Sequence, residues 1–287
     1  MNSTVYVVHC IDTEGPLDET TPALFERINS VFGLNLEPSE ETLEDLQCCR
    51  SELVADQSVA SEIARMVDPR LRDYLSSWDQ IAEMLQEALS IEYRERYSDS
   101  FGRPWIYNWF CVDHVGFISN PRNRALGFHR VFDWYQETLK RTNSVYDGLH
   151  FHHHPVAFSR EAHHSGTNYL SFKPVVFEIL SRRLIDRKWF PEAYRPGFHT
   201  IRPDSHWFLE QYIPFDYSNQ AKGEGYLEGQ RDLANGRFGD WRRAPANWTP
   251  YHPHHDDYQS IGNCRRWIAR CLNVGTRTRL LEESDVE

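Results

Sequence analysis

The sequence has no apolar run that approaches the roughly 20 residues needed to cross a membrane. Its first residues, MNSTVYVVHCID, contain no basic residue, so they lack the pattern of a secretory signal peptide. Cys-x-x-Cys pairs are also missing among the six cysteines, which argues against a structural zinc site held by thiolates. These absences predict a protein without a membrane span, with free thiols, in a reducing, cytoplasmic setting.

Positive charge is scarce as well. The chain carries 31 Lys and Arg against 42 Asp and Glu, which gives a formal net charge of −11. Such a surface repels phosphate, so we expect no nucleic-acid partner. The glycine-containing stretch KGEGYLEG at 222–229 is not preceded by a strand and followed by a helix, so it does not indicate a dinucleotide site.

Strand and helix patterns alternate along much of the 287 residues. Strands are predicted for VYVVHC at 5–10 and for the run at 103–117, and amphipathic helices for 127–141 and 173–188. Polar residues follow the strands at their exits. The pattern predicts one α/β domain over residues 1–287, built on a largely parallel sheet or barrel.

Residues of about 17–100 break this alternation and read as a helical insertion after the first strand. Ser77 and Gln80 have the spacing of a capping box before a helical run. We expect the insertion to be mostly structural and to cover part of a site. At the other end of the chain, Ser284 and Glu287 match the start of a capped helix, so either native sequence continues beyond Glu287 or the tail is frayed.

The stretch DGLHFHHHPVAF at 147–158 places four histidines in five positions. His150 and His154 are four residues apart, and Pro155 excludes a continuing helix, so we expect a loop at a strand exit that aims both imidazoles at one ion. The alternative is a solvated histidine patch. Of His152 and His153, one is expected to be a third ligand or to point into the site, and the other to face solvent.

Carboxylates follow the first predicted strand in HCIDTEGP. Asp12 and Glu14 can divide the work of a metal site, one binding the ion and the other taking a proton from its water. The alternative is a polar turn with Asp12 as a cap.

Further along, Arg195 in YRPGFH is fixed by the following Pro and Gly and can hold a carboxylate with two hydrogen bonds. Asp113, at the exit of the second strand, is another candidate or a turn cap.

Taken in this order, the three motifs IDTEGP, HFHHH and RPGFHTIRPD resemble those of the polysaccharide deacetylase family, the NodB-homology carbohydrate esterases. The sequences HFHHHP and YHPHHDDYQSIGNCRRWIARCLN are most similar to those of the WbmS-like branch, which is linked to surface polysaccharide synthesis. The resemblance covers residues of about 4–16 and 103–275. It implies an α/β fold with a distorted (β/α) barrel and a helical insertion after the first strand.

The resemblance also implies a function, namely zinc-dependent or other divalent-metal-dependent removal of an N-acetyl group from a carbohydrate. It makes Asp12 the general base, oriented by Arg195, and makes Glu14, His150 and His154 the metal ligands. The aromatic residues Trp207 and Trp241 are candidates for stacking on sugars, although core packing is the plainer interpretation.

Three features depart from the family pattern. Glu14 stands where Asp is usual, and the Arg-Pro-Gly sequence lacks the usual spacer before Pro. The late histidine expected as general acid has only His252 as a candidate. A deacetylase-like, metal-binding scaffold without turnover is therefore an alternative from another class. A metal-dependent phosphoesterase is a third hypothesis, but it would require more carboxylate ligands.

Overall fold

The computed structural model describes residues 4–50, 52–72, 75–113, 115–117, 127–156, 160, 173–197, 201, 203–220, 241 and 243–271. Within these ranges the chain forms a six-stranded parallel sheet, a two-stranded hairpin and eight α-helices. This arrangement confirms the α/β class. None of the helices described combines the length and apolar character that a membrane span requires.

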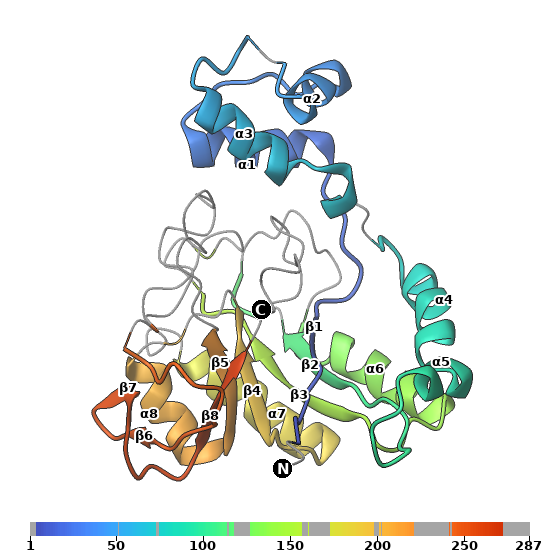
Figure 1. Ribbon diagram of the computed structural model, residues 1–287, viewed down its shortest axis with the longest axis vertical. Coiled ribbons are helices and arrows are strands. Elements are labelled where there is room, and N and C mark those ends of the chain that lie inside the picture. The colour runs from blue at the N-terminus through green and yellow to red at the C-terminus, as the bar shows by residue number, and fades with distance from the viewer. Residues whose placement is uncertain are drawn as a thin grey trace.

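The main sheet has the strand order β1-β2-β3-β4-β5-β8, and all neighbouring strands are parallel. Its members are β1 (Cys10–Thr13), β2 (Asn108–Asp113), β3 (Gly148–His153), β4 (Ala193–Pro196), β5 (Phe215–Gln220) and β8 (Trp267–Cys271). When each strand is added beside the previous one through a right-handed crossover, the helices gather on one face and the sheet curls around the other. The sheet accordingly curls into a half-barrel (Figure 1).

The connecting helices are α6 (Arg130–Arg141), α7 (Lys173–Arg187) and α8 (Pro203–Tyr212). Two apolar clusters fasten them to the sheet. One joins β2 to α6 through residues such as Trp109 and Phe132, and the other joins β3 and β4 to α7 and α8 through Phe151 and Tyr194. The antiparallel hairpin of β6 (Pro253–His254) and β7 (Asp257–Ile261) lies next to α8.

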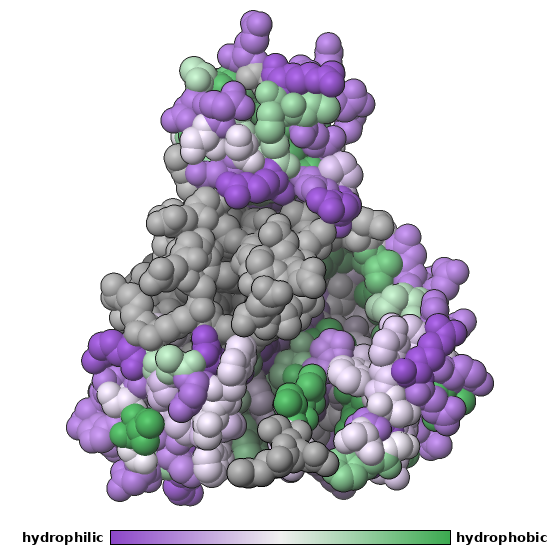
Figure 2. Space-filling view, viewed as in Figure 1, coloured by the Kyte–Doolittle hydropathy of each residue, from purple (hydrophilic) through white to green (hydrophobic). Residues whose placement is uncertain are grey.

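The predicted helical insertion is present, and it has two parts. Residues 17–72, which we call the helical lobe, contain α1 (Thr21–Phe32), α2 (Glu40–Gln47), α3 (Gln57–Met66) and the short 3-10 helix Pro69–Leu71. The lobe has an apolar core of its own, separate from the clusters of the sheet. It lies beyond the carboxyl-terminal ends of the strands (Figure 1), and hydrophilic side chains cover most of its visible surface (Figure 2).

The helices of the insertion begin where the sequence supplies capping side chains. The N-caps are Thr20, Ser39, Asp56, Ser77 and Ser90. The capping box predicted for Ser77 and Gln80 is confirmed at the start of α4 (Trp78–Ala88), which is followed by α5 (Ile91–Arg96). The entry and exit of the lobe meet where the backbone N–H of Leu17 donates to the carbonyl of Leu75, at 3.1 Å.

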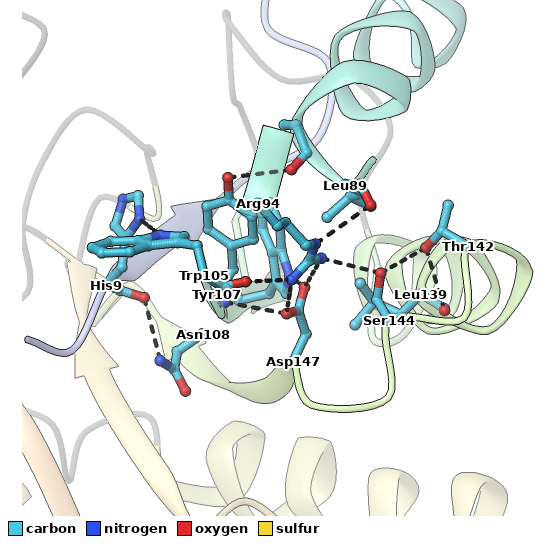
Figure 3. A network of polar contacts seen from close by, with 12 residues as sticks. His9, Leu89, Arg94, Trp105, Tyr107, Asn108, Leu139, Thr142, Ser144 and Asp147 are labelled. Carbon is cyan, nitrogen blue, oxygen red and sulfur yellow. Dashed lines mark hydrogen bonds and ion pairs between the residues drawn. The ribbon is translucent and has the colours of Figure 1, made fainter. Parts of the chain in front are cut away.

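A buried ion pair fastens the end of the insertion to the sheet (Figure 3). Arg94 of α5 donates from both terminal nitrogens to the carboxylate of Asp147, just before β3, at 2.7 and 2.9 Å. The same carboxylate accepts from the backbone N–H of Tyr107 and from Nε1 of Trp109. Four donors therefore satisfy one buried carboxylate, which compensates for its loss of water.

The predicted bounds of the first strand, residues 5–10, are wrong. Pairing with β2 begins only at Cys10, which lies opposite Asn108, and continues to Thr13. The apolar residues Val5–Val8 are exposed instead of buried in the sheet. All six cysteines are free; Cys111 is buried, whereas Cys10 is partly exposed.

Candidate metal site

Three side chains converge at the carboxyl-terminal edge of the sheet. Nε2 of His154 lies 3.2 Å from Oε1 of Glu14 and 3.1 Å from Nε2 of His152. One ligand atom from each of the three residues lies within 4.8 Å of the other two. The two histidines are buried, and Glu14 is partly exposed. The imidazoles are thus enclosed by protein, whereas the carboxylate of Glu14 is accessible to solvent.

The local backbone explains why these residues meet. Successive side chains of a strand point to opposite faces, so His152 in β3 and His154 just beyond it lie on the same side. Glu14 follows directly after β1. The chain then turns at Gly15, whose φ of 77° is in the left-handed region, and a Cβ at this position would press against the ring of Trp78. The turn therefore directs Glu14 towards β3 while the insertion begins.

His152 has a defined hydrogen-bonding role. Its Nδ1 lies 2.8 Å from the backbone carbonyl of Arg195, an acceptor only, so Nδ1 must carry the proton and donate. Nε2 is then left as the lone-pair atom that faces His154 and Glu14. Burial lowers the pKa of His152, partly countered by the carboxylate of Asp12, which favours the neutral imidazole that binds a metal.

Asp12 lies beside the group and is held by Arg195. Nε and Nη2 of the arginine donate to the two carboxylate oxygens at 2.8 and 3.2 Å, and Nη1 donates to the carbonyl of Tyr217. Burial alone lowers the pKa of the Arg195 guanidinium, but Asp12, together with Cys271 and Cys10, more than offsets this and raises it. The predicted two-pronged contact is present. It fixes a partly exposed carboxylate 3.7 Å from Nδ1 of His152.

The structure does not bring His150 into the group. This residue also faces the inside of the curled sheet, but it lies two positions earlier in β3, about 6.6 Å back along the strand. Its Nε2 is 3.1 Å from the side-chain oxygen of Asn108. Burial lowers the pKa of His150 to about 4. We therefore replace His150 with His152 in the candidate ligand set.

His153 and Asp113 form a separate pair on the outer face of the sheet. Nδ1 of His153 lies 2.9 Å from Oδ1 of Asp113, and both residues are almost completely buried. Neither side chain faces solvent, so the expectation of a solvated histidine at 152 or 153 is wrong. Asp113 is a partner of this histidine. His114, named with it in the sequence, lies outside the described residues.

His252, the candidate for the late general acid, does not lie in the candidate metal site. Its Nδ1 lies 3.1 Å from the carbonyl of Arg266, and its ring lies against Trp267, the first residue of β8. It is therefore at the amino-terminal end of that strand, whereas the group above is at the carboxyl-terminal ends. Trp241 is buried against Tyr258, and Trp207 is half-exposed on α8.

The donor set fits a divalent metal ion. Two imidazole nitrogens and one carboxylate oxygen are the ligands of many catalytic zinc sites, in which a fourth position is kept for water or substrate. The distances of 3.1 and 3.2 Å between donor atoms approach the edge of about 3.3 Å expected for a tetrahedron with bonds of roughly 2.0–2.1 Å. Within the described part of the chain, this is the single group of at least three His, Cys, Asp or Glu residues with such spacing.

Comparison of this chain with protein-family models, with curated proteins and with solved structures finds no significant match.

Sequence reasoning named Asp12, Glu14, His154 and Arg195 as site residues, and it left open which of His152 and His153 points into the site. The signal was available, because a run of histidines directly after a strand-forming segment should be read with the strand period of two. On that reading His152 and His154 share a face, and so does His150. Which two of the three reach the ion depends on where the strand ends, and the sequence pattern does not define that boundary.

Proposed function

We propose that this protein is a metal-dependent hydrolase that removes an acetyl group from the nitrogen of an N-acetylated sugar or polysaccharide precursor. In this proposal the curled sheet is the distorted (β/α) barrel of the polysaccharide deacetylase type. The main support is the convergence of Glu14, His152 and His154 beside the arginine-held carboxylate of Asp12. A metal site and an adjacent fixed base are the two parts that amide hydrolysis by water requires.

The proposed roles follow from the contacts. Glu14, His152 and His154 would hold the ion, which when bound polarises the acyl carbonyl and lowers the pKa of its water towards about 7. Asp12 would accept the proton from the attacking water. Arg195 keeps Asp12 ionised and directs its carboxylate. Water supplies the oxygen of the released acetate, and the nitrogen leaves as an amine after it gains a proton.

Acetate release from N-acetylated amino-sugar oligomers, measured on zinc-loaded protein, tests the proposal. We expect Asp12→Asn to keep stoichiometric zinc but to lose activity by about 10²- to 10⁴-fold, the usual contribution of a general base. His152→Ala should lose both zinc and activity. The matched control is His150→Gln, which changes a neighbouring histidine of the same strand and should retain both.

A second candidate is a deacetylase-like scaffold that holds metal without turnover. The position of His252 at the opposite edge of the sheet favours it, because this residue then does not supply the proton for the leaving amine. Zinc binding by the wild type with no acetate release from any N-acetylated sugar tested would support the scaffold. Activity that survives in Asp12→Asn would contradict the proposed mechanism.

A further inference from the structure

Two residues at the carboxyl-terminal end of β4, Arg195 within the strand and Gly197 directly after it, contact three different groups of the candidate metal site. The guanidinium of Arg195 holds Asp12, and its backbone carbonyl holds Nδ1 of His152. The third contact is made by Gly197, which is buried beside His154. The first two contacts are polar, whereas the third depends on the absence of a side chain.

A side chain at position 197 would collide with a proposed ligand. The three atoms nearest to a Cβ built on Gly197 are Cγ, Cδ2 and Nδ1 of His154, and all three would overlap with it. These atoms form the near side of the imidazole. Nε2, on the far side of the ring, is the atom that faces Glu14 and His152. The glycine thus allows the ring to lie against the β4 exit with Nε2 directed into the group.

Backbone strain is not the reason for glycine here. Gly197 is not among the glycines of the described chain with a φ in the left-handed region, so alanine can adopt its backbone conformation. The effect of a methyl group at this position is therefore steric and is directed at one ring.

We propose that Gly197 is a positioning residue for His154, and that the absence of a side chain at the β4 exit sets where this imidazole meets the metal ion. The inference rests on the proposed function to the extent that Glu14, His152 and His154 bind a metal. It adds a residue that has no side chain to the determinants of metal affinity.

The chain contains a matched control. Gly148, at the start of β3, also has no left-handed φ, and a Cβ there would overlap the ring of a histidine, His150. That histidine lies outside the proposed ligand set. Gly148→Ala and Gly197→Ala therefore introduce the same methyl group against the same kind of ring, but only the second one is directed at a ligand.

The test measures binding of Co²⁺ to the purified full chain by calorimetry, together with the visible absorption of the bound ion. We expect Gly197→Ala to weaken binding by about 10- to 100-fold, the usual effect of losing support around a ligand, and to change the absorption spectrum. Gly148→Ala should leave both unchanged. A general loss of stability would not alter the spectrum of the ion that remains bound.

A double-mutant cycle makes the inference specific to His154. In a His154→Ala background, Gly197→Ala should have no further effect on Co²⁺ affinity, because the ring it displaces is gone. If Gly197→Ala alone fails to fold, its recovery in the His154→Ala background supports the steric contact, and failure in both backgrounds overturns it.

The outcomes separate the two proposals. A wild-type protein that binds neither Co²⁺ nor Zn²⁺ would overturn the metal site itself, and the inference with it. If Gly197→Ala binds the ion as tightly as the wild type does, the inference is overturned, but the metal site is not. An equal loss of affinity from Gly197→Ala with and without His154 would also overturn it.

Discussion

The helical insertion and the rest of the chain differ sharply in their ionisable residues. Residues 17–100 contain nineteen carboxylates and seven arginines, with no lysine and no histidine. The remainder contains 23 carboxylates, 24 lysines and arginines, and all 14 histidines. The net charge of the protein therefore belongs to the insertion, and every histidine lies outside it.

This difference separates two physical roles within one chain. The helical lobe has its own apolar core and a largely hydrophilic visible surface. The lobe buries one ion pair, Arg27 with Glu19, whereas the sheet domain buries a larger set of charged and titratable groups, among them Asp113, His152, Arg195 and Arg266. Mutations and pH should therefore affect the two regions differently, and the predictions below test that separation.

The largest effect is expected where the two regions are joined. Asp147→Asn leaves the buried guanidinium of Arg94 without its counter-charge, and we expect the free energy of unfolding to fall by about 3–5 kcal/mol in urea titrations. The control is Asp68→Asn, which breaks the exposed pair with Arg70 in the lobe and should change stability little. Equal losses from the two variants would contradict the distinction between buried and exposed pairs.

Acid should weaken the sheet domain before the lobe. Burial, and then the charge of Arg266, lower the pKa of His206 to about 4. Because the unfolded chain takes up this proton near pH 6.5, the stability is fully present above that pH and is lost as the pH falls towards 4. Hydrogen exchange at pH 7 and pH 5 should show declining protection in the sheet and constant protection in α1 and α3.

His206→Gln provides the control for this pH effect. Glutamine can accept from Arg266 and donate to the carbonyl of His255, as the neutral imidazole does, but it does not titrate. We expect the loss of stability between pH 7 and pH 5 to shrink by on the order of 1 kcal/mol. A pH profile identical to that of the wild type would contradict the assignment to His206.

The smallest effect is expected on the surface of the lobe, and it has the opposite sign. Glu40 and Glu44 are four residues apart on α2, which has no basic residue in its last turn. Glu44→Lys replaces a repulsive pair with an attractive one and complements the helix dipole, so we expect a gain of about 0.5 kcal/mol. Hydrogen exchange within α2 measures this gain, and Glu44→Gln should show part of it.

The comparison also shows what could be predicted from the sequence. The helices of the insertion were recognisable because Ser77 and Gln80 act locally, within one turn of the chain. Asp12 and Arg195 were recognisable only through the order of the three motifs, because a carboxylate at a strand exit is also explained as a turn cap. The choice of His152 over His150 was not, because it depends on the register between β2 and β3 and on where β3 ends. These are tertiary properties that no local pattern records.

The hydrogen bond between Leu17 and Leu75 has a consequence for how such a chain can change over time. Because the two ends of the lobe are adjacent, more than fifty intervening residues can be exchanged, lengthened or lost at a single point of attachment. A change in the length or composition of the lobe therefore does not require the strands below it to be rearranged.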